Sequence, residues 1–300
     1  MKVEQEFNKA GDGNPSPVFL LLLIFIKIFD IIYINKKERR CLLMGRTFAS
    51  SDWHGCEVAR KVFDFLKPDD TLYFLGDAAD RGPIGAELIE NILNDNRIIY
   101  LKGNHEEFFI ECMLNIYNTN YVGGMNGVWY YQNGGEPTID AFIDKKKYTR
   151  EQIISIIEKI EKLPTVCNYK NEKGNNIILE HAGYTPWGFK KLQHHDPLWD
   201  RTHFSDPYDQ KGANTYIIHG HTPVQYLQFY YGYVDQPKRT VEDIKRKKAW
   251  ENDKLIENWK PTILHYCNGH KIDLDLCTIE SNRVALLDLD TFEEIYFDVD

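Results

Sequence analysis

Short apolar segments alternate with segments of helical periodicity along most of this chain, and this alternation restricts the fold more than any other feature. Five segments have the pattern of strands, namely 46–50, 71–75, 97–101, 177–180 and 216–219. The periodicity of helices is found at 56–66, 84–94 and 149–161 and in a segment that starts at Glu106. Strands that alternate with helices are typical of an α/β core, and we predict this fold class.

The remaining segments complete a single predicted domain. Residues 120–147 are rich in Gly and Asn and predict loops with a short cap, whereas 235–260 have the composition of a charged helical insertion. Residues 270–297 alternate apolar and polar side chains and predict two or three closing strands. Because no repeat and no linker interrupts these segments, we predict one domain over residues 44–300.

Composition narrows the functional classes. Hydrophobic residues make up 43% and charged residues 27% of the chain, which excludes a disordered or fibrous protein. The formal net charge of −9 disfavours general binding to nucleic acid, and we expect no nucleic-acid partner. The six cysteines form no CxxC pair, so we expect reduced thiols in a cytoplasmic protein.

Residues 17–34 are the one membrane-like segment of the sequence. Lys27 and Asp30 interrupt it and no small-residue cleavage site follows it, which disfavours both a membrane span and a signal peptide. Our preferred hypothesis is that residues 1–43 are a non-native leader and that the protein starts at Met44. The Lys-Glu-Arg-Arg just before Met44 has codons that can spell a ribosome-binding sequence. The alternative is a membrane anchor, and only then is the membrane an expected partner.

Five polar motifs follow the predicted strands directly. They are DWHG at 52–55, GDAADRG at 76–82, GNHE at 103–106, HAG at 181–183 and HGHTP at 219–223. The carboxyl ends of strands are where α/β sheets build their sites, so we expect the five motifs to meet.

The residue types in these motifs indicate metal ions. Mixed oxygen and nitrogen ligands without cysteine suit Mn, Fe or Zn better than a structural zinc site. Two such ions with a bridging carboxylate form the arrangement that hydrolyses phosphate esters. We therefore predict two divalent metal ions, with Mn²⁺ preferred and Fe or Zn as alternatives.

Together the motifs closely resemble those of the calcineurin-like metallophosphoesterase superfamily. GDxxDRG and GNHE resemble its phosphoprotein-phosphatase branch in the short bacterial and phage version. The resemblance runs from about Arg46 to the C-terminus and implies a β-sandwich flanked by helices (α/β/β/α). The implied metal ligands are Asp52 and His54 for the first metal, Asp77 for both, and Asn104, His181 and His221 for the second. His219 would be a supporting residue.

The resemblance also implies the reaction. A hydroxide that bridges the two metals would attack phosphorus, and His105, oriented by Asp80, would protonate the leaving alkoxide. Arg81 would bind the phosphate oxygens, and Arg201 resembles the second phosphate-binding arginine of the family. The implied enzyme is a serine/threonine protein phosphatase that acts on a phosphoprotein or a small phosphoester.

A second substrate class stays open. A symmetric dinucleoside tetraphosphate hydrolase of the same superfamily has a similar Asp-x-His-Gly-Cys loop, and Cys56 follows DWHG here. Residues 271–275 (KIDLD) stand where the family usually has an Ile-Asp-Thr-Gly-like turn, which leaves substrate choice open. Trp53, Tyr184 and Trp187 flank ligand loops and either pave a substrate groove or pack in the core.

Overall fold

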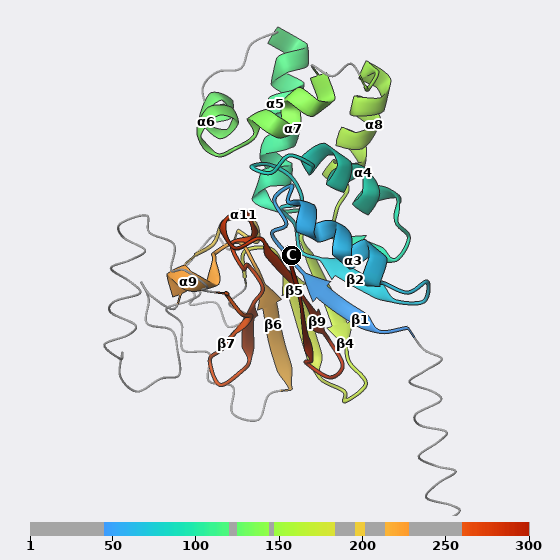
Figure 1. Ribbon diagram of the computed structural model, residues 1–300, viewed down its shortest axis with the longest axis vertical. Coiled ribbons are helices and arrows are strands. Elements are labelled where there is room, and N and C mark those ends of the chain that lie inside the picture. Colours follow the sequence, from blue (N-terminus) through green and yellow to red (C-terminus); the bar gives the residue numbers. More distant parts are fainter. Residues whose placement is uncertain are drawn as a thin grey trace, which may run out of the picture. The chain divides into compact units, whose positions relative to one another are not determined.

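Two five-stranded sheets organise the structure, a computed structural model that describes residues 45–119, 125–143, 147–183, 196–201, 214–227 and 260–299 (Figure 1). From Arg46 onward these residues belong to one compact unit. In the described ranges, no helix has the length and apolar character needed to cross a bilayer. The predicted leader at 1–43, nearly all of the insertion at 235–260, Tyr184 and Trp187 lie outside the described residues.

The first sheet, sheet A, has the strand order β10-β9-β1-β2-β3. Its strands are β1 (Thr47–Ser50), β2 (Thr71–Phe74), β3 (Ile98–Tyr100), β9 (Arg283–Asp288) and β10 (Glu294–Asp298). The strands β1, β2 and β3 are parallel, while β9 and β10 are antiparallel additions at one edge. The three parallel strands therefore end at the same edge of the sheet, where each is followed by a predicted motif.

The second sheet, sheet B, has the strand order β4-β5-β6-β8-β7. Its strands are β4 (Val166–Lys170), β5 (Asn176–Glu180), β6 (Thr215–His219), β7 (Leu264–Tyr266) and β8 (Lys271–Asp273). The central strands β5, β6 and β8 are parallel, and the edge strands β4 and β7 pair antiparallel. The HAG and HGHTP motifs thus follow neighbouring parallel strands.

Helices connect the strands of sheet A and continue beyond it. They are η1 (Glu57–Ala59), α3 (Arg60–Phe65), α4 (Gly85–Asn94), α5 (Asn104–Thr119), α6 (Met125–Gln132), α7 (Glu136–Ile143), α8 (Arg150–Glu161), α9 (Val224–Tyr226) and α11 (Thr278–Ser281). In Figure 1, α5, α6, α7 and α8 lie together in the upper part of the view. A capping box at Thr149 and Gln152 starts α8.

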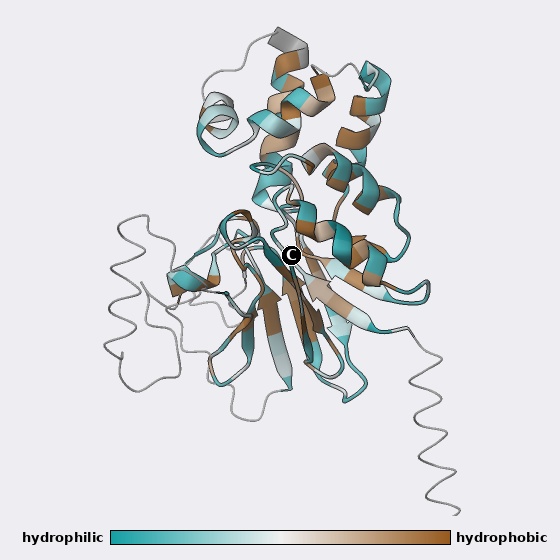
Figure 2. Ribbon diagram, viewed as in Figure 1, coloured by the Kyte–Doolittle hydropathy of each residue, from teal (hydrophilic) through white to brown (hydrophobic). Residues whose placement is uncertain are grey.

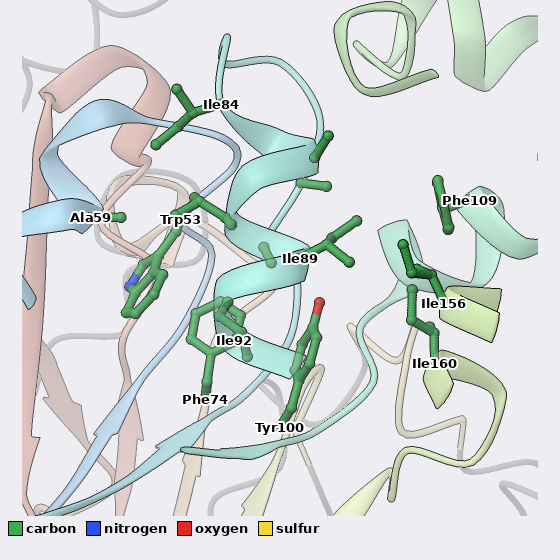
Figure 3. Packing of buried hydrophobic residues seen from close by; sticks show 14 of the residues in the cluster. Trp53, Ala59, Phe74, Ile84, Ile89, Ile92, Tyr100, Phe109, Ile156 and Ile160 are labelled. Carbon is green, nitrogen blue, oxygen red and sulfur yellow. The ribbon is translucent and has the colours of Figure 1, made fainter. Parts of the chain in front are cut away.

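Alternating side chains on the strands build two hydrophobic cores. Phe48 of β1 packs in a core with the helices, and the next residue, Ala49, packs in a core that contains residues of both sheets. Figure 3 shows the first core, where Trp53 and Phe74 lie beside α4. Figure 2 shows largely hydrophobic strands and hydrophilic loops between them. A fully buried large apolar side chain stabilises the fold by about 2 kcal/mol. The two cores therefore fix the positions of the sheets, and the polar loops are attached to strands whose positions are fixed.

The fold class predicted from the sequence is confirmed, and one prediction is wrong. The segment 120–147 was predicted to form loops with a short cap, but it contains the helices α6 and α7, and α7 buries Ile139 and Phe142 at helical spacing. The three closing strands β8, β9 and β10 are confirmed. The sequence analysis missed β4, an edge strand whose side chains are half-buried or exposed, so that it lacks an apolar run.

Candidate active site

Hydrogen bonds between loops of the two sheets bring the five motifs together. The amide of Asp52 donates to Gly76 O at 3.1 Å, which joins the loops after β1 and β2. The amide of Gly220 donates to His181 O at 2.9 Å, which joins the loops after β6 and β5. The amide of His221 donates to Asp52 Oδ2 at 3.0 Å, and this bond joins sheet B to sheet A.

Asp77 lies at the centre of this arrangement. Its Oδ2 is 3.7 Å from His54 Nε2, and its Oδ1 is 3.4 Å from His181 Nε2. Two groups of possible metal ligands share this residue, one with His54 and His105 and the other with His181 and His221. A carboxylate whose two oxygens face different ligand groups can bridge two ions.

Asn104 and Asp52 complete the set of predicted ligands. Asn104 Oδ1 lies 2.8 Å from His181 Nε2 and 3.0 Å from His221 Nδ1. Asp52 Oδ1 lies 3.8 Å from His54 Nε2. The structure thus brings all six predicted ligands into one buried cluster, each of them at most 5% exposed.

Two unpaired polar atoms of the cluster indicate whether divalent cations can bind there. Asp52 Oδ1 and His221 Nε2 are buried, and neither has a hydrogen-bond partner in the ranges that the structure describes. Buried polar atoms are normally paired, and a carboxylate oxygen and an imidazole nitrogen are both good ligands for Mn, Fe or Zn. The residues present therefore fit a site for divalent metal ions.

Backbone strain is concentrated at the same residues. Positive φ angles occur at Asp52 (56°), His54 (44°), Asp77 (59°), Asp80 (73°), Arg81 (65°) and His221 (70°). The left-handed conformation costs about 1–2 kcal/mol for a residue with a Cβ atom. Strain of this kind persists where the surrounding structure enforces it, commonly at functional sites.

The electrostatics of the cluster centre on Asp77. Burial would raise the pKa of Asp77, but the charges of His181 and His105 hold it well below its usual range. Burial would lower the pKa of His181, but the Asp77 carboxylate raises it to about 10. Burial and the charge of His181 lower the pKa of His221 well below its usual value. The lowered pKa of Asp77 keeps its carboxylate negative at the centre of the cluster, and a negative group favours a bound cation.

His105 and Asp80 form a buried pair beside the cluster. His105 Nδ1 lies 2.6 Å from Asp80 Oδ2, and Asp80 is fully buried. Burial lowers the pKa of His105, while the Asp77 charge and the hydrogen bond to Asp80 together raise it above its ordinary value. With Nδ1 held by Asp80, the other ring nitrogen, Nε2, lies 3.9 Å from Asp77 Oδ2. This imidazole can therefore hold a proton next to the ligand cluster.

A cavity of about 710 Å³ opens onto the cluster. Both predicted phosphate-binding arginines line it. Arg81 reaches the cluster, with Nη1 2.6 Å from His54 Nε2 and Nη2 3.1 Å from His105 Nε2. Arg201 is exposed, and its Nη2 donates to His221 O at 3.5 Å. Guanidinium groups, the His105 imidazole and candidate metal ligands therefore line the same cavity.

Two residues that organise the site were missed by the sequence analysis. The buried carboxylate of Glu106 accepts hydrogen bonds from the amides of Asp77, Ala78 and Gly103. Its place inside the GNHE motif was a signal for such a role. Trp129 of α6 donates from Nε1 to Asp80 Oδ2 at 2.6 Å. No sequence signal marked Trp129, because its segment was expected to form loops.

The structure also decides between the alternatives for other residues near the motifs. Trp53 is fully buried with its ring 4.3 Å from that of Phe74, so it packs in the core rather than paving a groove. His219 lies outside both ligand groups, and its Nε2 is 2.7 Å from the hydroxyl of Tyr266. Asp275, from the KIDLD segment, lines the cavity.

Comparison with known proteins identifies the family. A model of the family described as calcineurin-like phosphoesterase matches residues 45–271, a span that contains all five motifs. The chain belongs to this family. As a calcineurin-like phosphoesterase it is a metal-dependent phosphatase, and the buried cluster around Asp77 supplies candidate ligands for its divalent metals.

No curated protein matches the sequence. Among solved structures, a candidate diadenosine tetraphosphatase has 14% identity, a TM-score of 0.49, and coverage of 86% of this chain and 95% of its own. A metallophosphoesterase from Sphaerobacter thermophilus has 16% identity, a TM-score of 0.41, and coverage of 85% and 88%. A protein serine/threonine phosphatase from Saccharomyces cerevisiae, with similarity to human PP5, has 15% identity, a TM-score of 0.40, and coverage of 85% and 80%. The family assignment rests on the family model.

Proposed function

We propose that this phosphatase is a serine/threonine protein phosphatase that uses two divalent ions, with Mn²⁺ preferred over Fe or Zn. The observation that carries the proposal is the His105–Asp80 pair, which places an imidazole at the ligand cluster with its Nδ1 held at 2.6 Å. The alkoxide of serine or threonine is a poor leaving group and needs a proton as the ester bond breaks. A positioned imidazole is suited to donate that proton near neutral pH.

The proposal assigns the metal ligands as follows. Asp52 and His54 would hold one ion, Asp77 would contribute to both, and Asn104, His181 and His221 would complete the other. Two divalent ions at such a site supply Lewis acidity toward the phosphoryl oxygens and a nucleophilic water near neutral pH.

The protein side chains have separate roles in this proposal. Arg81 and Arg201 line the cavity and would bind the phosphate oxygens, where the planar guanidinium can form paired hydrogen bonds. His105 would protonate the leaving oxygen, and Asp80 would keep its Nδ1 protonated so that Nε2 carries the transferred proton. His105 also belongs to one of the two ligand groups, and its acid role is proposed from the resemblance of its motif to that of the family.

The first experiment separates the proposed substrate from the alternative. The purified full chain with Mn²⁺ is given a phosphothreonine peptide and diadenosine tetraphosphate in parallel reactions, and the products are followed by chromatography. We expect orthophosphate from the peptide and an intact dinucleotide. Nucleotide release with an intact peptide would instead support the dinucleoside tetraphosphate hydrolase. Cys56 adds no support for that alternative, because its buried thiol packs 3.6 Å from the carbonyl oxygen of His54.

The role of His105 has its own test, the variant His105→Asn. We expect kcat for an alkyl phosphate to fall about 100-fold or more, the range for losing a general acid, while p-nitrophenyl phosphate loses far less. The reason is that p-nitrophenolate leaves without a proton. Equal losses on both esters would contradict the acid role and would favour His105 as a metal ligand.

The proposed partners and location follow from the sequence. We propose a phosphoprotein or a small phosphoester as the substrate and the cytoplasm as the compartment, and the reduced cysteines support the second point. Detection of peptides from residues 17–34 in a membrane fraction would support the membrane anchor instead.

A further inference from the structure

Trp129, from a helix outside both sheets, contacts the buried His105–Asp80 pair. Its indole Nε1 donates to Asp80 Oδ2 at 2.6 Å, and His105 Nδ1 lies 2.6 Å from the same oxygen. The other carboxylate oxygen, Oδ1, is buried and has no hydrogen-bond partner among the described residues. Oδ2 therefore accepts hydrogen bonds from both N–H groups. The bond from the indole fixes the orientation of the Asp80 carboxylate relative to the imidazole.

The indole ring is closely packed against Phe108 and Gly135. Phe108 of α5 stacks on it, with ring centroids 5.9 Å apart and an interplanar angle of 20°. Gly135 lies so close to the ring that a Cβ atom there would be 2.7 Å from Trp129 Cε2. Trp129 is fully buried. A ring held in this way can place its N–H group with little freedom, which is what a positioning residue needs.

Residues near Trp129 in the sequence also accept hydrogen bonds from the backbone amides of Asp80 and Arg81. The amide of Asp80 donates to Thr138 Oγ1 at 2.9 Å, and the amide of Arg81 donates to Gly134 O at 2.6 Å. Asp80 and Arg81 both have positive φ angles, of 73° and 65°. Hydrogen bonds from residues 129–138 thus hold two consecutive strained residues, together with the carboxylate of the first.

We propose that Trp129 is a positioning residue for proton donation to the leaving group, and that it acts through Asp80 on His105. The inference rests on the proposed function, in which His105 is the general acid. Without the indole N–H, the Asp80 carboxylate keeps His105 as its donor in the described part of the chain and can rotate between its two oxygens. The imidazole then presents its Nε2 less accurately to the leaving oxygen.

The test compares two buried tryptophans. Trp129→Phe keeps a buried ring and removes the N–H group that reaches Asp80. Trp53→Phe is the matched control, because Trp53 is also fully buried and donates a hydrogen bond from Nε1, at 2.8 Å to Ser50 Oγ. For Trp129→Phe we expect kcat for an alkyl phosphate to fall about tenfold, the effect of one lost charge-assisted hydrogen bond, with KM unchanged. The rate for p-nitrophenyl phosphate should stay within about twofold, since its leaving group needs no proton.

A double-mutant comparison shows whether Trp129 acts through Asp80. In an Asp80→Asn background, Trp129→Phe should cause no further loss on the alkyl ester, because the two residues serve the same step. A purely structural role predicts losses that multiply and that affect both esters alike. That result, or an unchanged ratio of alkyl to aryl rates in Trp129→Phe, overturns the proposal.

An analogue of tryptophan and an NMR resonance test the role of Trp129 if the first variant does not fold or the enzyme is inactive. If Trp129→Phe does not fold, β-(3-benzothienyl)alanine at position 129 keeps the ring size and replaces the N–H group by sulfur, and the same ratio of alkyl to aryl rates is measured.

Independently of activity, the ¹⁵N–¹H resonance of His105 Nδ1 should shift in the position-129 variant and stay in place in Trp53→Phe. An unmoved resonance rejects the role of Trp129. Failure of the wild type to hydrolyse any alkyl phosphate rejects the proposed function, while the resonance still decides on Trp129.

Discussion

The carboxylate of Glu106 shows how one side chain can organise several loops at once. Its Oε2 accepts from the amides of Asp77 at 2.8 Å and Gly103 at 2.7 Å. Its Oε1 accepts from the amide of Ala78 at 2.9 Å and from the hydroxyl of Tyr100 at 2.7 Å. Three of the four partners are backbone N–H groups, which can only donate, so a carboxylate suits this position.

This arrangement makes Glu106→Gln a sharp test. In either orientation the amide NH₂ of glutamine would leave at least one buried backbone N–H group without an acceptor, so we expect a loss of about 2 kcal/mol in the free energy of unfolding. The control is Glu107→Gln, where the side chain accepts one hydrogen bond from Trp199 Nε1 and a glutamine oxygen can replace it. We expect less than about 1 kcal/mol for that control. Urea unfolding followed by fluorescence measures both, and similar losses in the two variants would refute this account of Glu106.

At the scale of elements, the site depends on the close approach of loops from different sheets. The loop after β6 passes so near the loop after β1 that a Cβ atom at Gly220 would collide with Asp52 Oδ2 and Ser51 Oγ. The loop after β3 passes the loop after β2 in the same way, because a Cβ atom at Gly103 would collide with Asp77 Oδ1. Glycine at these positions lets two metal-ligand loops lie in direct contact.

We therefore expect Gly220→Ala to lower metal affinity about tenfold or more, because the displaced Asp52 carboxylate loses its place in the ligand cluster. The control is Gly174→Ala in the turn between β4 and β5. Gly174 has a φ of 83°, and a Cβ atom at this position would have no other atom within 4 Å. That variant should lose about 1 kcal/mol of stability from backbone strain and keep its metal affinity. Titration with Mn²⁺ measures the affinities, and an unchanged affinity in Gly220→Ala would show that the contact is not needed.

At the scale of the whole molecule, the ligand cluster ties the two sheets together. Sheet A supplies Asp52, His54 and Asp77 through the loops after β1 and β2, and sheet B supplies His181 and His221 through the loops after β5 and β6. Ions bound by both sets of residues would therefore stabilise the folded protein and not the unfolded chain. Binding at a free ion concentration of about 100 times Kd adds about 2.7 kcal/mol.

Metal removal should accordingly lower the melting temperature. We expect a chelator to lower it by about 5–10 °C, since each kcal/mol corresponds to about 2–4 °C in a chain of this size. Calorimetry with and without EDTA measures the shift. Asp77→Asn should show little shift, because the residue common to both ligand groups is changed. A shift of equal size in Asp77→Asn would place the stabilising ion elsewhere.

The fold class and the order of the motifs could be predicted from the sequence, and the candidate site residues followed from the resemblance of the motifs to a known family. These predictions were possible because strand periodicity and short polar motifs are local features, and because motifs at the ends of parallel strands must meet at one edge. The six candidate ligands, the His105–Asp80 pair and Arg81 were all named from their motifs. The helices of 120–147 were not predicted because the Gly and Asn residues around them indicate loops, although Ile139 and Phe142 of α7 have the spacing of a buried helix face.

Only the tertiary structure decided which residues support the site from a distance in sequence. Trp129 lies 49 positions from Asp80 in the chain, and no local pattern connects an indole on one helix to a carboxylate in a loop. The position of Asp77 between two histidines likewise appears only when loops of two sheets place His54 and His181 near different oxygens of one carboxylate. Contacts of this kind depend on how whole elements pack, because each partner is positioned by a different part of the core.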